Sequence, residues 1–293
     1  MSNFERYKLA YLKMSNFKKN IKFSIDNREE TKKRKNILKT NIVFKNCHEG
    51  ERVFILANGP SIKNEKLDFL KGEYVFTVNQ MIRKPYFVEL EPLANFWFDP
   101  AYFDEKMPET SKNEFINLFK KTCNCNEKII NFVPLDSFDF LKKNELVDNR
   151  VHFIDTSLFF YDGYDKEFDF TKCCPSFQNI VQFAIAMAVY MGFKKIYLLG
   201  VDSTGIITKI NSVLDRDIED CYGIDLGESG QKYVNSLLDY FSVEQQFEGW
   251  TRIFHLYKEL FRYCEHRGIE LLNCSSQTII EGIPRTKLES VFK

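Results

Sequence analysis

The stretch that decides the fold is residues 184–202, Ala-Ile-Ala-Met-Ala-Val-Tyr-Met-Gly-Phe-Lys-Lys-Ile-Tyr-Leu-Leu-Gly-Val-Asp. Its first half continues an apolar run that predicts a buried helix at about 179–191, and Gly192 is typical of a helix C-cap. The second half predicts a strand at 195–201 that stops at Asp202. Because this strand is apolar on both faces, it indicates a sheet covered on both sides, hence a parallel sheet in an α/β fold.

Outward from this stretch, short apolar runs that stop at polar residues predict the other strands. These lie at 52–56, 74–78, 93–98, 128–133, 151–154 and 269–273. A helix is expected to begin near Ser61 and a long one to cover 251–266. The segment at about 203–250 shows little periodicity and predicts a loop that closes over a binding site.

The charge of the chain is unevenly distributed. Its 293 residues contain 41 Lys or Arg and 41 Asp or Glu, which argues against a globally basic nucleic-acid binder. Residues 1–45, however, hold 13 basic and 4 acidic residues, against 28 and 37 in residues 46–293. The predicted organisation is therefore a basic N-terminal arm, 1–45, and one Rossmann-like domain, 46–293.

The arm carries Phe4, Tyr7, Tyr11, Met14 and Phe17 at roughly helical spacing among lysines. This pattern fits an amphipathic helix on anionic lipid, although a solvated extension explains it as well. The longest apolar run in the chain is too short to span a bilayer, which needs about 20 residues. We therefore expect a cytoplasmic protein, peripheral at most on the inner face of the cytoplasmic membrane.

Neither cysteines nor acidic residues give a convincing metal site. The eight cysteines include no C-x-x-C pair and lack histidines at zinc-site spacing, which indicates reduced, structural thiols. Asp215 and Asp217 form a D-x-D triplet of the kind that holds Mn²⁺ or Mg²⁺. Because this triplet lies in a charged, loop-like stretch, a solvated acidic loop is favoured, and no metal or other cofactor is expected.

Polar residues recur where the predicted strands end. They are Asn58, Gly59, Pro60, Ser61, Asn79, Gln80, Asp99, Asp202, Asn273, Ser275 and Ser276. Ligands of open α/β sheets bind at this edge, where Gly59 would allow close approach and the following helix would offer amides to a phosphate. The turn is neither a G-x-G-x-x-G fingerprint nor a Walker A loop, so NAD and P-loop nucleotide sites are weak alternatives.

Five segments, in order, resemble the bacterial sialyltransferase family of Campylobacter type. Residues 57–61 resemble its G-N-G-P-S turn, 78–80 its C-N-Q motif, and 98–100 its Y-N-P. Residues 184–202 resemble its helix–strand segment, and 272–276 its last strand with a C-P-N-S turn. Motility accessory factors, other surface-polysaccharide glycosyltransferases and archaeal 6-hydroxymethylpterin diphosphokinases share these turns. The resemblance implies a single glycosyltransferase-A type domain that binds CMP-sialic acid without a metal.

The resemblance also implies roles for the first turns of the domain. Asn58, Gly59 and Ser61 would touch the phosphate and ribose of the nucleotide. Asn79 and Gln80 would bind the donor.

Further donor contacts are implied later in the chain. Asp99 would take the place of an asparagine beside the donor. Ser176 and Gln178 would lie near a donor-binding turn, and Ser275 and Ser276 would face the cytidine or its phosphate.

The catalytic base of this family has no counterpart in the matching loop. That loop, 233–244, contains no histidine, and the nearest one, His255, is interpreted as an ordinary helical residue. Asp239 or Glu244 could accept the proton of the acceptor hydroxyl. Tyrosines that could hydrogen-bond the departing phosphate are Tyr222, Tyr233 and Tyr240.

The favoured function is inverting transfer of sialic or another nonulosonic acid from its CMP form, in the assembly of bacterial lipopolysaccharide, capsule or lipooligosaccharide. The acceptor would be a glycan or a lipid-linked glycan, and a homo-oligomer is left open. One alternative is a Mg²⁺-dependent pyrophosphokinase like the pterin enzymes, with Asp202, Asp215 and Asp217 at the metal. The other is a nucleotide-binding relative without catalysis, which the missing histidine motivates.

Overall fold

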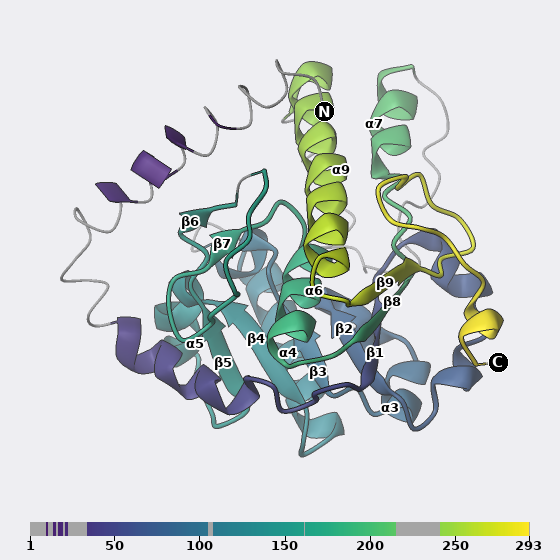
Figure 1. The fold of residues 1–293 in the computed structure, drawn as a ribbon. Coiled ribbons are helices and arrows are strands. Elements are labelled where there is room, and N and C mark those ends of the chain that lie inside the picture. The colour runs from purple at the N-terminus through teal and green to yellow at the C-terminus, as the bar shows by residue number, and fades with distance from the viewer. Residues whose placement is uncertain are drawn as a thin grey trace.

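A seven-stranded sheet forms the centre of the molecule (Figure 1). The computed structural model describes residues 34–104, 108–160, 162–214 and 241–292, with residues 10, 14–15, 17–19 and 21–22 of the N-terminal segment. The strands are β1 (Arg52–Leu56), β2 (Tyr74–Val78), β3 (Ala94–Phe96), β4 (Ile130–Pro134), β5 (Val151–Ile154), β8 (Lys195–Leu199) and β9 (Glu270–Asn273). Every neighbouring pair in the order β5-β4-β3-β2-β1-β8-β9 is parallel, which confirms the predicted α/β, Rossmann-like class.

The strand order reverses between β1 and β8. From β1 the chain runs outward through β2 to β5, then returns to β8 on the other side of β1 and ends at β9. The connections after β1 and after β8 therefore diverge. Open α/β sheets have their ligand crevice at such a reversal, beyond the carboxyl ends of the strands.

Alternate strand residues serve two separate apolar layers. Val53 and Ile55 of β1 pack with α6 (Ile180–Tyr190) and α9 (Val243–Glu265). Phe54 and Leu56 face the opposite layer. That layer contains η2 (Pro60–Asn64), η3 (Leu67–Leu70), η4 (Asn79–Arg83) and α3 (Tyr86–Leu90), and is continued by α4 (Glu109–Cys125) and α5 (Phe138–Lys143). Burial on both faces explains why the strands lack polar alternation.

The remaining elements are short. They are η1 (Lys39–Phe44), η5 (Pro100–Phe103), η6 (Leu135–Ser137), β6 (Leu158–Phe159), β7 (Pro175–Ser176), α7 (Gly205–Val213) and η7 (Leu288–Phe292). Strands β6 and β7 form a separate parallel pair.

Two expectations about helices are wrong. The chain after Gly59 forms only the five-residue 3-10 helix η2. The segment at 203–250, expected to be a loop, contains α7 and the first turns of α9, while its residues 215–240 lie outside the described residues. Helix α9 starts eight residues earlier than expected because Ser242 and Gln245 form a capping box, each side chain accepting from the backbone N–H of the other.

Residues 34–45, part of the predicted arm, pack on the sheet domain. Leu38, Asn41 and Phe44 are buried. The Asn41 amide donates to the backbone oxygens of Phe153 and Phe170, both at 2.8 Å. This stretch is therefore part of the packed body, whatever the rest of the basic segment does.

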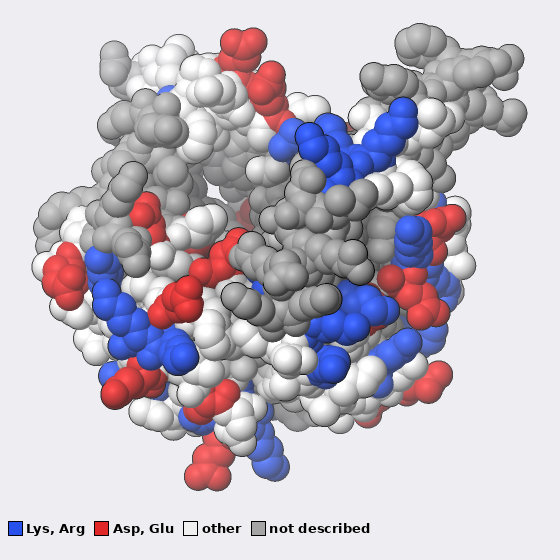
Figure 2. Space-filling model, turned by 90° about the vertical axis from the view of Figure 1, so that its left-hand side faces the viewer, with Lys and Arg blue, Asp and Glu red and all other residues white. Residues whose placement is uncertain are grey.

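Charged side chains of both signs are interspersed on the face shown in Figure 2. Within the described part of the chain, we find no helix with the length and apolar character needed to cross a bilayer.

Candidate functional site

A cavity of about 450 Å³ opens where β1, β2 and β8 end. Its volume lies in the range typical of small-molecule sites. The predicted residues in its wall are Asn58, Gly59, Asn79, Asp99, Gln178 and Asp202. They come from five separate segments of the chain, and the sheet brings them together at the reversal of strand order.

Two glycines allow the segments that follow β1 and β8 to lie in direct contact before they diverge. The Gly59 N–H donates to the Gly200 oxygen at 2.8 Å. A Cβ on Gly59 would lie 2.4 Å from that oxygen and 2.7 Å from the Asp202 carboxyl carbon. A Cβ on Gly200 would lie 2.3 Å from the Ala57 oxygen, and the φ of Gly200 is +65°. Glycine at 59 is thus required by the segment 200–202 of the same chain, whereas the sequence suggested that it allows close approach of a ligand.

The Asp202 carboxylate binds the turn after β1. It accepts from the Ser61 backbone N–H at 2.6 Å and from the Ser61 hydroxyl at 2.5 Å, and both residues are almost fully buried. Burial raises the pKa of the Asp202 carboxyl, which the two hydrogen bonds from Ser61 partly offset. In this arrangement neither group of Ser61 is available to a phosphate. The Asp202 carboxylate therefore takes the hydrogen bonds from Ser61 that the sequence analysis assigned to the nucleotide phosphate.

Two asparagines in the cavity wall, by contrast, each have a side-chain oxygen without a hydrogen-bond partner. The Asn58 amide donates to the Val78 oxygen at 3.3 Å, but its Oδ1 is buried without a hydrogen-bond partner. The Oδ1 of Asn79 is also buried and unpartnered, and Asn79 has a left-handed backbone with φ of 49°. Buried acceptors left unpaired are costly, so this pair marks the place where a ligand with hydrogen-bond donors would be stabilised.

Helix α9 supplies a second wall that the sequence did not point to as a site. Trp250, Ile253 and Tyr257 line the cavity at helical spacing, so their periodicity was the available signal. A Cβ on Gly205, at the start of α7, would lie 3.0 Å from the Trp250 ring. The Tyr257 hydroxyl donates to Asn179 at 3.3 Å, and burial raises its pKa, so it stays protonated.

The other predicted donor residues are not in the cavity wall. Asn273 and Ser275 are buried and hold the segment after β8: Asn273 donates to the Val201 oxygen, and the Ser275 hydroxyl accepts from the Val201 N–H at 2.8 Å. Those that are exposed or engaged elsewhere are Pro60, in the first turn of η2; Gln80, which accepts from Arg83; Ser176, on β7; and Ser276, whose N–H donates to Glu65.

Most of the predicted catalytic residues lie outside the described residues. They are Tyr222, Tyr233, Asp239 and Tyr240, and the D-x-D pair Asp215 and Asp217 lies there too. Glu244 is described: it is exposed in the first turn of α9 and is not in the cavity wall. Among the residues that the structure describes, no three His, Cys, Asp or Glu side chains gather as metal ligands.

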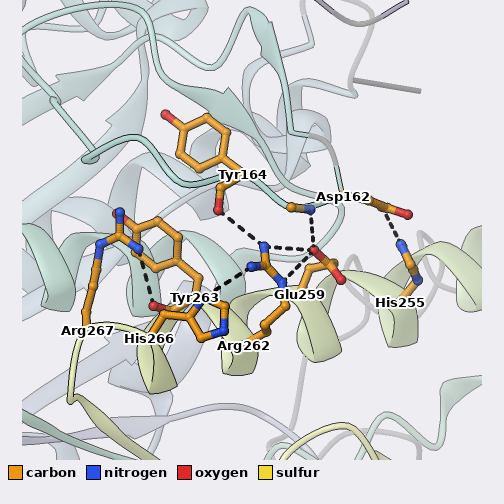
Figure 3. A network of polar contacts seen from close by, with 9 residues as sticks. Asp162, Tyr164, His255, Glu259, Arg262, Tyr263, His266 and Arg267 are labelled. Carbon is orange, nitrogen blue, oxygen red and sulfur yellow. Dashed lines mark hydrogen bonds and ion pairs between the residues drawn. The ribbon is translucent and has the colours of Figure 1, made fainter. Parts of the chain in front are cut away.

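His255 is not in the cavity wall, and its ring points toward Asp162 of the loop at 162–168 (Figure 3). Its Nε2 lies 2.5 Å from the Asp162 carboxylate, and this contact raises the pKa of the imidazole. Further along α9, Glu259 accepts from the Gly163 N–H at 2.7 Å and Arg262 donates to the Tyr164 oxygen at 3.3 Å. The network fastens this loop to α9, as expected of a structural histidine.

A larger hollow, of about 910 Å³, lies elsewhere, among η2, η3 and α3. Its wall includes Lys63, Lys66, Lys71 and Glu89. Lys66 pairs with Glu289 and Lys71 with Asp68 and Glu89, so much of its charge is already compensated. We take the smaller cavity as the candidate site, because it combines the strand reversal, unpartnered buried acceptors and an apolar wall.

No family model and no curated protein matches the chain. Among solved structures, it resembles the MAf glycosyltransferase from Magnetospirillum magneticum AMB-1, with 12% sequence identity and a TM-score of 0.46. The match covers 87% of this chain and 38% of that protein, so the chain spans well under half of the neighbour's length.

Proposed function

We propose that this chain is a glycosyltransferase that binds a nucleotide sugar in the cavity at the ends of β1, β2 and β8. The observation that carries the proposal is the pair of buried, unpartnered oxygens, Asn58 Oδ1 and Asn79 Oδ1, in that wall. Ribose hydroxyls and the amino group of a base are donors that would satisfy both acceptors. The apolar wall of Trp250 and Ile253 offers a surface for a sugar or base ring.

Within this class, we propose a CMP-linked donor, with sialic or another nonulosonic acid as the transferred sugar. The ordered strand-end motifs, with their resemblance to the sialyltransferase family, favour the same donor.

The acceptor is proposed to be a glycan or lipid-linked glycan of a bacterial surface polysaccharide, at the cytoplasmic side of the membrane. The basic segment 1–45 is proposed to contact anionic lipid. Of the two predicted general bases, Glu244 is not in the cavity wall. Asp239 stays a prediction for that role, as do Tyr222, Tyr233 and Tyr240 for the phosphate.

Thermal shift and calorimetric titration with CMP, UDP, GDP and ATP test the donor class. We expect CMP to bind most tightly, and Asn79→Ala to lower its affinity about tenfold, as loss of one hydrogen bond to a buried acceptor would. Asn46→Ala is the matched control, because Asn46 also has a left-handed backbone, with φ of 56°, but is not in the cavity wall. Tight, Mg²⁺-dependent ATP binding without CMP binding would overturn the proposal in favour of a pyrophosphokinase.

Release of free CMP from CMP-sialic acid by the purified chain tests catalysis separately. Turnover would support a transferase. Tight CMP binding without turnover of CMP-linked sugars, with or without glycan acceptors, would indicate a nucleotide-binding relative without catalysis.

A further inference from the structure

Gln178 and Arg252 meet at the edge of the cavity. Gln178 lines the cavity just before α6. Arg252 lies on α9, in sequence between the wall residues Trp250 and Ile253. Its guanidinium donates to Gln178 Oε1 at 3.4 Å, and both side chains are exposed. This contact places a positive charge beside the cavity wall.

The cavity wall itself supplies no cation. Of the described residues that line it, none is Lys, Arg or His. A nucleotide sugar carries charged phosphate oxygens, and a nonulosonic acid adds a carboxylate. Removing such groups from water is costly unless cationic donors pair with them. A ligand of the proposed class therefore needs a positive charge from the edge of the site.

Arg252 can supply that charge, because no carboxylate neutralises it within the part of the chain that the structure describes. Glu248, one turn earlier on α9, is not within ion-pair distance of its guanidinium, and neither is any other described carboxylate. Arg83, which lies in η4 after Asn79, is by contrast paired with Glu114. Of these two arginines, only Arg252 can turn to an anion without breaking an ion pair.

The same hydrogen bond determines what Gln178 offers to a ligand. A guanidinium has donors only, so Gln178 turns its amide oxygen to Arg252. The Gln178 amino group, with two N–H donors, has no hydrogen-bond partner among the described residues. Gln178 and Arg252 therefore present donors, whereas Asn58 and Asn79 present unpartnered acceptors from other segments of the wall.

We propose that Arg252 and the Gln178 amino group bind the charged oxygens of the ligand, which belong to its phosphate or its carboxylate. Asn58 and Asn79 would bind its hydroxyl and amino donors. The inference rests on the proposed function, because it needs a nucleotide sugar in the cavity. It adds Arg252, a residue that no strand-end motif indicates. An arginine suits this role, because its planar guanidinium can donate to two oxygens of one anion at once.

Calorimetric titration with cytidine, CMP and CMP-sialic acid tests the inference, because these ligands differ in their charged groups. The test variant is Arg252→Gln. Lys258→Gln is the matched control, since it removes one positive charge from the same helix at an exposed residue outside the cavity wall. Circular dichroism confirms that the variants fold.

We expect Arg252→Gln to weaken CMP binding about tenfold, as loss of a charge-assisted hydrogen bond would, and to change cytidine binding less than about twofold. If the guanidinium binds the sugar carboxylate, only the affinity for CMP-sialic acid falls, which supports the inference equally. Gln178→Glu keeps the acceptor for Arg252 but replaces the amino donor by a negative charge, so it should weaken binding of the same ligand at least as much. Lys258→Gln should bind all of them like the wild type.

Equal weakening of cytidine and CMP binding by Arg252→Gln would overturn the inference, because it would assign Arg252 a purely structural role. A wild type that binds the charged ligands and an Arg252→Gln variant that binds each of them equally well would also overturn it, and would leave the proposed function standing. A wild type that binds none of the ligands would refute the proposed function itself, and this inference with it.

Discussion

The asparagines that follow β1 and β2 differ from the polar residues that follow β8 and β9, although the sequence presents them alike. Asn58 and Asn79 keep a buried oxygen without a partner. The side chains of Asp202 and Ser275 instead accept hydrogen bonds from other parts of the chain, Asp202 from Ser61 and Ser275 from Val201. A polar residue at a strand end is therefore not by itself a ligand contact. Nor is an unpartnered buried atom enough, because Asn41 Oδ1 and His152 Nδ1 are also buried without a partner but do not line the cavity. What distinguishes this site is an unsatisfied acceptor in the wall of a cavity.

The largest expected effect is on stability, at the contact between the segments that follow β1 and β8. Gly59→Ala places a Cβ 2.4 Å from the Gly200 oxygen, and we expect it to lower the free energy of unfolding by more than ~3 kcal/mol. Gly249→Ala is the control: it lies within α9 with no neighbour within 4 Å of the added Cβ. The control should stabilise by up to ~1 kcal/mol. Urea denaturation measures the stability of both variants, and equal stabilities would show that the contact between Gly59 and Gly200 tolerates a side chain.

The next effect separates a bracing residue from a free acceptor. Ser61→Ala removes one of two hydrogen bonds to the buried Asp202 carboxylate, and should cost about 1–3 kcal/mol of stability. Asn79→Gly relieves a left-handed backbone and removes an unpartnered amide oxygen, so stability should stay within about 1 kcal/mol of the wild type.

Calorimetry completes this comparison. Asn79→Gly should weaken CMP binding about tenfold, as expected for a lost hydrogen bond to ligand. If Asn79→Gly is strongly destabilised while its CMP affinity is unchanged, the two strand-end regions do not differ as described.

The smallest expected effect is on stability, at the His255–Asp162 pair outside the cavity. The hydrogen bond to Asp162 raises the pKa of His255 above the ordinary 6.5. The pair therefore stabilises the fold below about pH 6.5, and this contribution is lost as the pH rises through the raised pKa. Because both side chains are partly exposed, His255→Gln should cost under ~1 kcal/mol. The melting temperatures of wild type and variant should differ at pH 5.5 and converge at pH 9; a constant difference would contradict the linkage.

The sheet was largely predictable, because apolar runs that are buried on both faces leave a local signal. The bounds of β1, β2 and β5 match the predicted runs. The start of α9 could have been found from the capping residues Ser242 and Gln245. The bond between Ser61 and Asp202 joins residues 141 positions apart, and nothing local marks it. For the same reason the sequence could not show which strand-end residues would line the cavity.

The most direct test of the central claim is a crystal structure of the chain with CMP. The account predicts CMP in the cavity at the ends of β1, β2 and β8, with its donors within hydrogen-bond distance of Asn58 Oδ1 and Asn79 Oδ1, and with Ser61 still bound to Asp202. CMP in the larger hollow beside Lys63, or in the cavity with both asparagine oxygens unpaired, would contradict it.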